Sequence, residues 1–91
     1  MVPILVDHRP SPDLLARLHL LEEPIRQFVV GAHEQCSPSR MVAYVAGGVA
    51  TLTSEDGAPI VIEAGMLLSI PAGCACLWEV SAPLTLHCRE R

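Results

Sequence analysis

The spacing of apolar residues changes near Pro24. Before it, leucines between residues 14 and 21 recur at helical spacing on one face. Ser11-Pro12-Asp13 is typical of a helix start, with a capping serine, a proline at the first helical position and an acid in the first turn. We expect a short helix over Pro12 to Leu21, preceded by an edge strand over Val2 to Val6.

After Pro24 the apolar period shifts toward two, and short β-forming runs alternate with turn-forming residues. The predicted strands are Ile25 to Ala32, Met41 to Ala46, Val49 to Thr53, Ile60 to Glu63, Met66 to Ile70, Ala75 to Val80 and Leu84 to Arg89. The predicted turns include Gly47-Gly48, Ala64-Gly65, Pro71-Ala72-Gly73 and Ser81-Ala82-Pro83. Strands packed this densely without helices between them indicate a sandwich or a barrel. We expect one all-β domain over residues 1–91, with a strand and helix segment at 1–24 and a β-barrel at 25–91.

Composition changes this picture mainly by excluding partners. Hydrophobic residues make up 51% of the 91 residues and charged residues 18%, which is ample material for a packed core. The net charge is −4 and basic residues do not cluster, so we expect neither a nucleic acid nor a membrane as partner. Lysine is absent, which excludes a Schiff-base nucleophile. A short chain with this much hydrophobic content would expose large apolar patches as a monomer. We therefore expect a homodimer.

The expected location is the cytoplasm. The chain starts without a positive charge ahead of its apolar stretch, unlike a secretory signal. Its longest uncharged runs are broken by glycine and proline and fall short of the roughly 18 residues that a membrane helix needs. We therefore interpret the four cysteines, at positions 36, 74, 76 and 88, as thiols.

The most specific segment runs from Gly65 to Cys76. A glycine, five residues, Pro71-x-Gly73 and two further residues precede Cys76, a spacing that resembles the second conserved motif of the cupin superfamily. Most cupins place a metal-ligating histidine where this chain has Cys76. The resemblance implies an antiparallel jelly-roll β-barrel.

The wider stretch resembles the small-cupin branch named for the ureidoglycine aminohydrolase cupin domain and the ethanolamine-utilisation cupin. Cys76, Trp78, Val80 and His87 match the branch pattern Pro-x-Gly-x-x-Cys-x-Trp-x-Val followed by His-Tyr, with Cys88 in place of the tyrosine. Upstream, the run from Tyr44 to Val49 resembles the family's strand turn, and Asp56-Gly57 resembles its hairpin turn.

The first cupin motif, His-x-His followed by glutamate and glycine, is degenerate in this chain. If Gly48 is taken as the glycine of the motif, Met41 occupies the glutamate position. If Gly47 is taken instead, Arg40 occupies that position, and His33 and Gln35 occupy the positions of the two histidines. We therefore expect a cupin without the usual metal. The alternative is a metal site, for zinc, iron, manganese or nickel, built from His33, Cys76 and His87 as substitute ligands.

Alternation along a strand puts Cys76 and Trp78 on one face. The resemblance to cupins implies that this face points toward the barrel interior. Trp78 is then either the largest core residue or a pocket wall. His33 directly follows a predicted strand, at a position for the pocket mouth or for a structural role. The face that His87 occupies stays open, because its neighbours at 84 and 86 are leucines. The spacing of Cys74 and Cys76 predicts that at most one of these thiols points inward.

The leading functional hypothesis is a small organic ligand bound inside the barrel, with Tyr44, Cys76 and Trp78 lining the pocket and His33 at its mouth. One alternative is a metal-dependent enzyme acting on a small polar metabolite. Another is a structural or regulatory dimer whose barrel is filled by its own side chains. Whether the protein is an enzyme stays open at this point. A nucleophilic role for Cys76 is disfavoured, because the chain offers no third group to orient a partner histidine.

Overall fold

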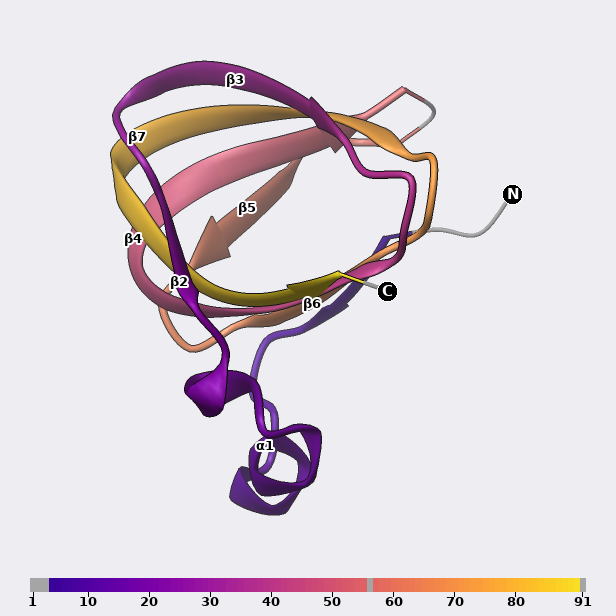
Figure 1. Ribbon diagram of the computed structural model, residues 1–91. Helices are drawn as coiled ribbons and strands as arrows, with labels where there is room; N and C mark the ends of the chain where they lie inside the picture. Colours follow the sequence, from indigo (N-terminus) through magenta and orange to yellow (C-terminus); the bar gives the residue numbers. More distant parts are fainter. Residues whose placement is uncertain (1–3, 56, 91) are drawn as a thin grey trace.

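Two long strands, β4 (Met41–Ser54) and β7 (Ala75–Glu90), form the centre of the fold in the computed structural model, which describes residues 4–55 and 57–90. They pair antiparallel along nearly their whole length, from Met41 opposite Glu90 to Ser54 opposite Cys76. Both strands curve strongly, so that the sheet they organise closes toward a barrel (Figure 1).

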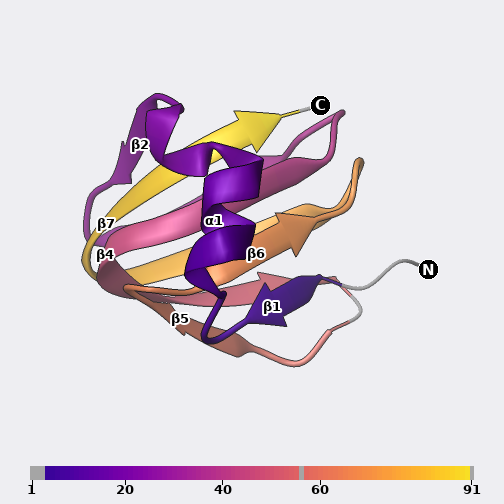
Figure 2. The same cartoon turned by 90° about the horizontal axis from the view of Figure 1, so that it is seen from below.

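The shorter strands attach to these two. β5 (Ile60–Glu63) and β6 (Leu67–Ile70) pair with β4, β2 (Ile25–Phe28) and β3 (Gly31–Cys36) pair with β7, and β1 (Leu5–Asp7) pairs with β6. All these pairings are antiparallel. The helix α1 (Pro12–Leu18) lies outside the barrel, as Figures 1 and 2 show. The predicted all-β architecture, an antiparallel jelly-roll barrel with a short N-terminal helix, is confirmed.

Two of the predicted turns are bends within the long strands. Gly47-Gly48 lies inside β4 and Ser81-Ala82-Pro83 lies inside β7, so four predicted strands are in fact two. The pairing register between β4 and β7 shifts repeatedly between Val45 and Ala50, which marks β-bulges at this bend. Gly48 has a φ of 93°, and a Cβ there would overlap the carbonyl oxygen of Pro83. Glycine and proline therefore allow both strands to bend together rather than to reverse.

Other boundaries differ from the prediction for local reasons. The predicted strand Ile25 to Ala32 is split at Val29 and Val30 into β2 and β3. The helix ends at Leu18, because His19 adopts a left-handed conformation (φ 54°), and a 3-10 turn η1 (Leu20–Glu22) follows. The predicted first strand starts in residues 1–3, and the predicted hairpin turn includes Asp56; both positions lie outside the described residues. No helix in the described part of the chain is long and apolar enough to cross a membrane.

The core consists of the inward-facing residues of the long strands and of β5 and β6. Alternation is visible in β7, where Cys76, Trp78 and Val80 are buried and Glu79 is exposed. No polar or charged residue of the described ranges is fully buried. The buried set is Met41, Ala43, Val45, Ala50, Leu52, Ile62, Met66, Leu68, Ile70, Cys76, Trp78, Val80, Leu84 and Leu86.

Candidate functional site

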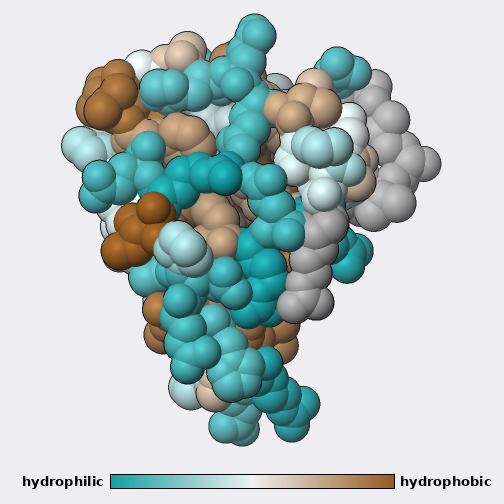
Figure 3. Space-filling view, viewed as in Figure 1, coloured by the Kyte–Doolittle hydropathy of each residue, from teal (hydrophilic) through white to brown (hydrophobic). Residues whose placement is uncertain are grey.

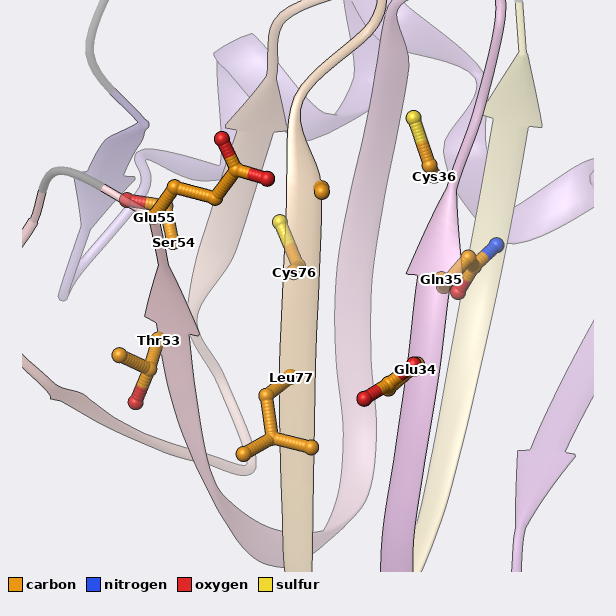
Figure 4. Close-up of a pocket in the computed structure, with 9 residues that line it drawn as sticks. Glu34, Gln35, Cys36, Thr53, Ser54, Glu55, Cys76 and Leu77 are labelled. Carbon is orange, nitrogen blue, oxygen red and sulfur yellow. The ribbon is translucent and has the colours of Figure 1, made fainter.

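A hollow lies where β3 and β4 end and β7 begins (Figure 4). Its volume is about 430 Å³. Three neighbouring strands supply its walls: Glu34, Gln35 and Cys36 from β3; Thr53 and Ser54 from β4 with Glu55 after it; and Ala75, Cys76 and Leu77 from β7.

The strand register explains why these residues meet. Leu77 pairs with Glu34 on one side and Thr53 on the other, so these three side chains share one face of the sheet. Cys76, one position earlier, pairs with Gln35 and Ser54 on the opposite face. The hollow therefore contacts both faces of the sheet, as an opening at the end of a barrel does.

The hollow is acidic. Glu34 and Glu55 are both exposed and lie on opposite walls, and none of the nine described lining residues is basic. The ion pairs among the described residues use other carboxylates, those of Glu22, Glu23 and Glu90. Two carboxylates facing one open volume favour a ligand that carries positive charge.

A much smaller hollow lies on the inner face of the barrel. This second hollow, lined by inward-facing side chains, has a volume of only about 10 Å³, roughly the size of one water molecule. It is lined by Gln35, Ser37, Met41, Ile70, Cys74, Cys76 and Trp78. Two buried polar atoms of these residues, Oε1 of Gln35 and Nε1 of Trp78, have no hydrogen-bond partner among the described residues.

Cys76 and Trp78 lie on the inner face, as expected. Cys76 is 5% exposed and contacts both hollows, and Trp78 is 1% exposed and contacts the smaller one. The Trp78 ring lies against Phe28, with centroids 5.2 Å apart. Whether either residue binds a ligand stays a prediction.

His33 and Tyr44 line neither of these two hollows. His33 lies within β3 opposite Trp78, and its Nε2 is 2.8 Å from the Val29 carbonyl oxygen, a contact that spans the bend between β2 and β3. Tyr44 lies between Ala43 and Val45, which both point into the core, so its own side chain is on the outer face of β4. The outer-face position of Tyr44 does not agree with a place in the wall of the interior hollow. His33, in contrast, shares the inner face with its pairing partner Trp78, and the centroid of its ring lies 5.4 Å from that of the Phe28 ring. A role of either residue in ligand binding stays a prediction.

His87 is on the outer face too. Leu84 and Leu86 are fully buried, so the leucine face of β7 is the core face and His87 points the other way. Its Nδ1 lies 3.1 Å from the carbonyl oxygen of Glu23, in the segment that follows the helix. Of the two faces that the sequence left open for His87, the structure therefore has it on the outer one.

These placements separate the substitute metal ligands. Cys76 is inward and His87 outward, and His33 already contacts a backbone carbonyl. Within residues 4–55 and 57–90, no three His, Cys, Asp or Glu side chains are grouped closely enough to hold a metal ion. The set His33, Cys76 and His87 therefore does not fit a metal centre.

Cys74 and Cys76 do not point apart as their spacing predicted. Their Sγ atoms are 3.7 Å from one another. β7 begins only at Ala75, so Cys74 belongs to the preceding turn and strand alternation does not apply to it. Burial, with a smaller effect from the neighbouring Cys74 thiol, raises the pKa of Cys76 to about 12. Cys76 therefore keeps its proton at neutral pH, and a thiol is a poor nucleophile.

Sequence patterns alone miss Glu34, Thr53, Glu55 and Leu77. Each lies at or near a strand end, and only the pairing register brings the three strand ends together. The one available signal is the recurrence of acidic residues at strand ends, which by itself is common on protein surfaces.

Comparison with known proteins agrees with the fold. The chain belongs to the family of EutQ-like cupin domains, whose model matches residues 25–86. A DUF861 family protein from Thermotoga maritima is 28% identical, with a TM-score of 0.91 over 98% of this chain and 100% of that chain. No curated protein matches the chain.

Two more distant structures share the fold alone. A protein of unknown function (DUF1255) from Acidithiobacillus ferrooxidans is 23% identical, with a TM-score of 0.68 over 69% of this chain and 60% of that chain. The Clostridium difficile EutQ protein is 18% identical, with a TM-score of 0.61 over 68% of this chain and 48% of that chain. The protein is thus a small cupin with structural relatives of unknown function.

Proposed function

We propose that this cupin binds a small organic cation in the hollow between the ends of β3, β4 and β7, without a resident metal. The observation that carries the proposal is an acidic hollow of about 430 Å³, a volume within the range of small-molecule sites. The sequence placed the ligand inside the barrel. The interior hollow of about 10 Å³ is too small for an organic molecule, so the proposed site moves to the barrel's end.

The wall chemistry specifies the ligand further. Glu34 and Glu55 offer carboxylates for one or two ammonium groups, and Thr53 and Ser54 offer hydroxyls. Leu77 and Ala75 form the apolar floor between them. A short aliphatic diamine, with a charge at each end and methylenes between, matches this arrangement.

Calorimetric titration with 1,4-diaminobutane tests the proposal, with succinate as the anionic probe of similar length. We expect the diamine to bind and succinate not to bind. The double variant Glu34→Gln/Glu55→Gln should lose at least about tenfold in affinity, which corresponds to about 1.4 kcal/mol. Glu63→Gln, an exposed carboxylate on β5 outside the hollow, is the matched control and should bind as the unmodified protein does. Equal affinity in all three proteins would refute an ammonium site here.

The proposal of binding without a metal rests on the separated residues His33, Cys76 and His87. Metal analysis of protein purified without chelators tests it. A stoichiometric transition metal, together with a higher melting temperature on adding zinc, iron or nickel, would instead support the metal-dependent enzyme.

A second candidate function is a structural or regulatory role for a filled barrel. The observation that favours it is the interior packing, in which Trp78 and Leu52 are fully buried and the hollow beside Trp78 measures only about 10 Å³. A failure of every cationic probe to bind, combined with a stable dimer, would favour this candidate. A reducing, cytoplasmic location is part of either proposal, supported by four free cysteines.

A further inference from the structure

The turn before β7 brings two sulfur atoms into contact. Gly73 has a φ of 73°, and its N–H donates to the Ser37 carbonyl at 2.8 Å. The Cys74 N–H donates to the Pro71 carbonyl at 3.3 Å, which closes the turn. In this conformation the Sγ of Cys74 lies 3.7 Å from the Sγ of Cys76, the first inward residue of β7. The contact is therefore held by the backbone on both sides and is not a chance approach of two flexible side chains.

The pair lies next to the acidic hollow. Cys76 contributes to the wall of that hollow, and Cys74, which is partly exposed, lines the small interior hollow together with Cys76. Figure 4 shows the sulfur atoms of Cys76 and Cys36 pointing toward the same end of the hollow. A small neutral oxidant can enter a volume of about 430 Å³ without any movement of the barrel.

We propose that Cys74 and Cys76 form a vicinal dithiol that a hydroperoxide oxidises to an intramolecular disulfide. With hydrogen peroxide, the Cys74 sulfur attacks one peroxide oxygen and the O–O bond breaks, giving a sulfenic acid and one water. The Cys76 sulfur then attacks the Cys74 sulfur and loses its proton, and the hydroxyl group leaves as a second water. Two thiols are oxidised and one peroxide is reduced, and a thiol reductant reverses the change.

The second step is intramolecular, so the proximity of the sulfurs compensates for the weak acidity of Cys76. A disulfide requires a separation of about 2.05 Å, and the sulfurs must approach one another to reach it. Cys74 lies in the turn and Cys76 in the paired strand, so the turn is the part that can adjust. The proposal does not depend on the ligand proposed above.

The disulfide would change the small interior hollow. Cys74, Cys76 and Trp78 line it together, so drawing the two sulfurs to one another changes the surroundings of the indole. Trp78 is the only tryptophan of the chain. Its fluorescence is therefore an internal reporter, and we expect the emission intensity to fall on oxidation and to recover on reduction.

Treatment of the reduced protein with one equivalent of hydrogen peroxide, followed by thiol titration in denaturant and peptide mass mapping, tests the proposal. The protein starts with four free thiols. We expect loss of two thiols, a mass lower by two hydrogens and a cross-link within the peptide that contains Cys74 and Cys76. A cross-link of either residue to Cys36, intermolecular disulfides alone, or stable sulfenic acid without a cross-link would each overturn the proposal.

Variants separate this pair from the other thiols. Cys36→Ser and Cys88→Ser should form the cross-link at the unmodified rate, whereas Cys74→Ser should keep its Cys76 thiol and show no reversible change in Trp78 emission. Loss of the cross-link in Cys36→Ser would show that Cys36 takes part and would also overturn the proposal. The mapping of the unmodified protein decides the question even if the Cys74→Ser chain does not fold.

Discussion

Arg89 and Glu23 form an ion pair that joins the end of β7 to the segment after the helix. The Nε and one terminal nitrogen of Arg89 lie 2.9 and 2.8 Å from the same Glu23 oxygen, Oε1. His87 reaches the backbone carbonyl of Glu23 from the same face of β7. Since α1 itself buries no residue, these contacts help to fix the N-terminal segment against the barrel.

Replacing Glu23 should therefore cost more than replacing a similar residue in a looser pair. The side chains of Arg89 and Glu23 are 20% and 29% exposed, whereas those of Arg26 and Glu90, 2.8 Å apart, are 40% and 36% exposed. We expect Glu23→Gln to lower the free energy of unfolding by about 1 to 2 kcal/mol and Glu90→Gln by less than about 0.5 kcal/mol. Urea denaturation measures both, and equal costs would show that the Glu23 pair contributes no more than an ordinary surface pair.

The shared bend of β4 and β7 predicts a sharp difference between two adjacent glycines. A Cβ at Gly48 would overlap the Pro83 carbonyl oxygen, and its positive φ adds backbone strain; a Cβ at Gly47 meets nothing within 4 Å. We expect Gly48→Ala to destabilise the protein by at least about 2 kcal/mol and Gly47→Ala to change stability by less than about 1 kcal/mol. Thermal and urea unfolding of the two variants check this, and a tolerated Gly48→Ala would mean that the strands do not meet so closely.

The unpaired Trp78 nitrogen predicts that phenylalanine is tolerated at this position. Trp78→Ala removes the largest fully buried side chain and should cost about 3 to 5 kcal/mol. Trp78→Phe keeps most of the ring and removes a buried donor that has no partner among the described residues, so its cost should stay below about 2 kcal/mol. The stability of the two variants in urea tests the difference. A phenylalanine variant as unstable as the alanine variant would indicate that the indole N–H is satisfied in solution.

The fold was predictable because several independent local sequence signals indicate it. The start of the helix at Pro12 and the strand Ile60–Glu63 follow the pattern residue by residue, and the Pro-x-Gly turn before Cys76 matches a family motif. The pairs Gly47-Gly48 and Ala82-Pro83 misled, since turn-forming residues also permit a bend in a paired strand. Only the opposite strand distinguishes these cases, and the sequence does not show which strand is opposite.

The candidate site was less predictable, because it depends on register and face. Alternation placed Cys76 and Trp78 correctly, since both lie within one regular strand. It failed for Cys74, which precedes the strand by one residue. The motif resemblance did not specify the face that Tyr44 occupies, which is the outer face of β4. Glu34 and Glu55 are 21 positions apart in the sequence. They share a hollow only because β7 lies between β3 and β4.

The edge formed by β2 and β3 predicts where two copies meet. Val29 and Val30, at the bend between these strands, are 70% and 59% exposed, and Figure 3 shows hydrophobic patches on that side of the molecule. We propose a homodimer that covers this edge, since an open strand edge with apolar side chains favours association. Light scattering should give twice the monomer mass of 9.8 kDa, and Val29→Glu/Val30→Glu should give the monomer mass. Val61→Glu, equally exposed on β5, is the matched control; a monomeric unmodified protein would contradict the proposal.

Stability at alkaline pH should report the Cys76 thiol. Burial raises its pKa from the ordinary 9.0 to about 12 in the folded protein, so between these values unfolding releases a proton and rising pH favours the unfolded chain. The stabilising contribution is complete below pH 9 and is lost as the pH rises toward 12, with a slope of up to about 1.4 kcal/mol per pH unit. Burial also raises the pKa of Cys88, which acts in the same direction.

Urea unfolding under reducing conditions measures how the free energy of unfolding changes with pH. The series runs from about pH 8 to about pH 10.5, roughly the range over which the thiol of the unfolded chain titrates. We expect Cys76→Ala to flatten the decline above pH 9 and to leave a remainder that Cys88 supplies. Val80→Ala, a truncation on the same buried face without a titratable group, should lower stability by a similar amount at every pH and keep the full slope. If both variants show the same slope, the Cys76 sulfur is solvated in the folded protein, and its assignment to the barrel interior is wrong.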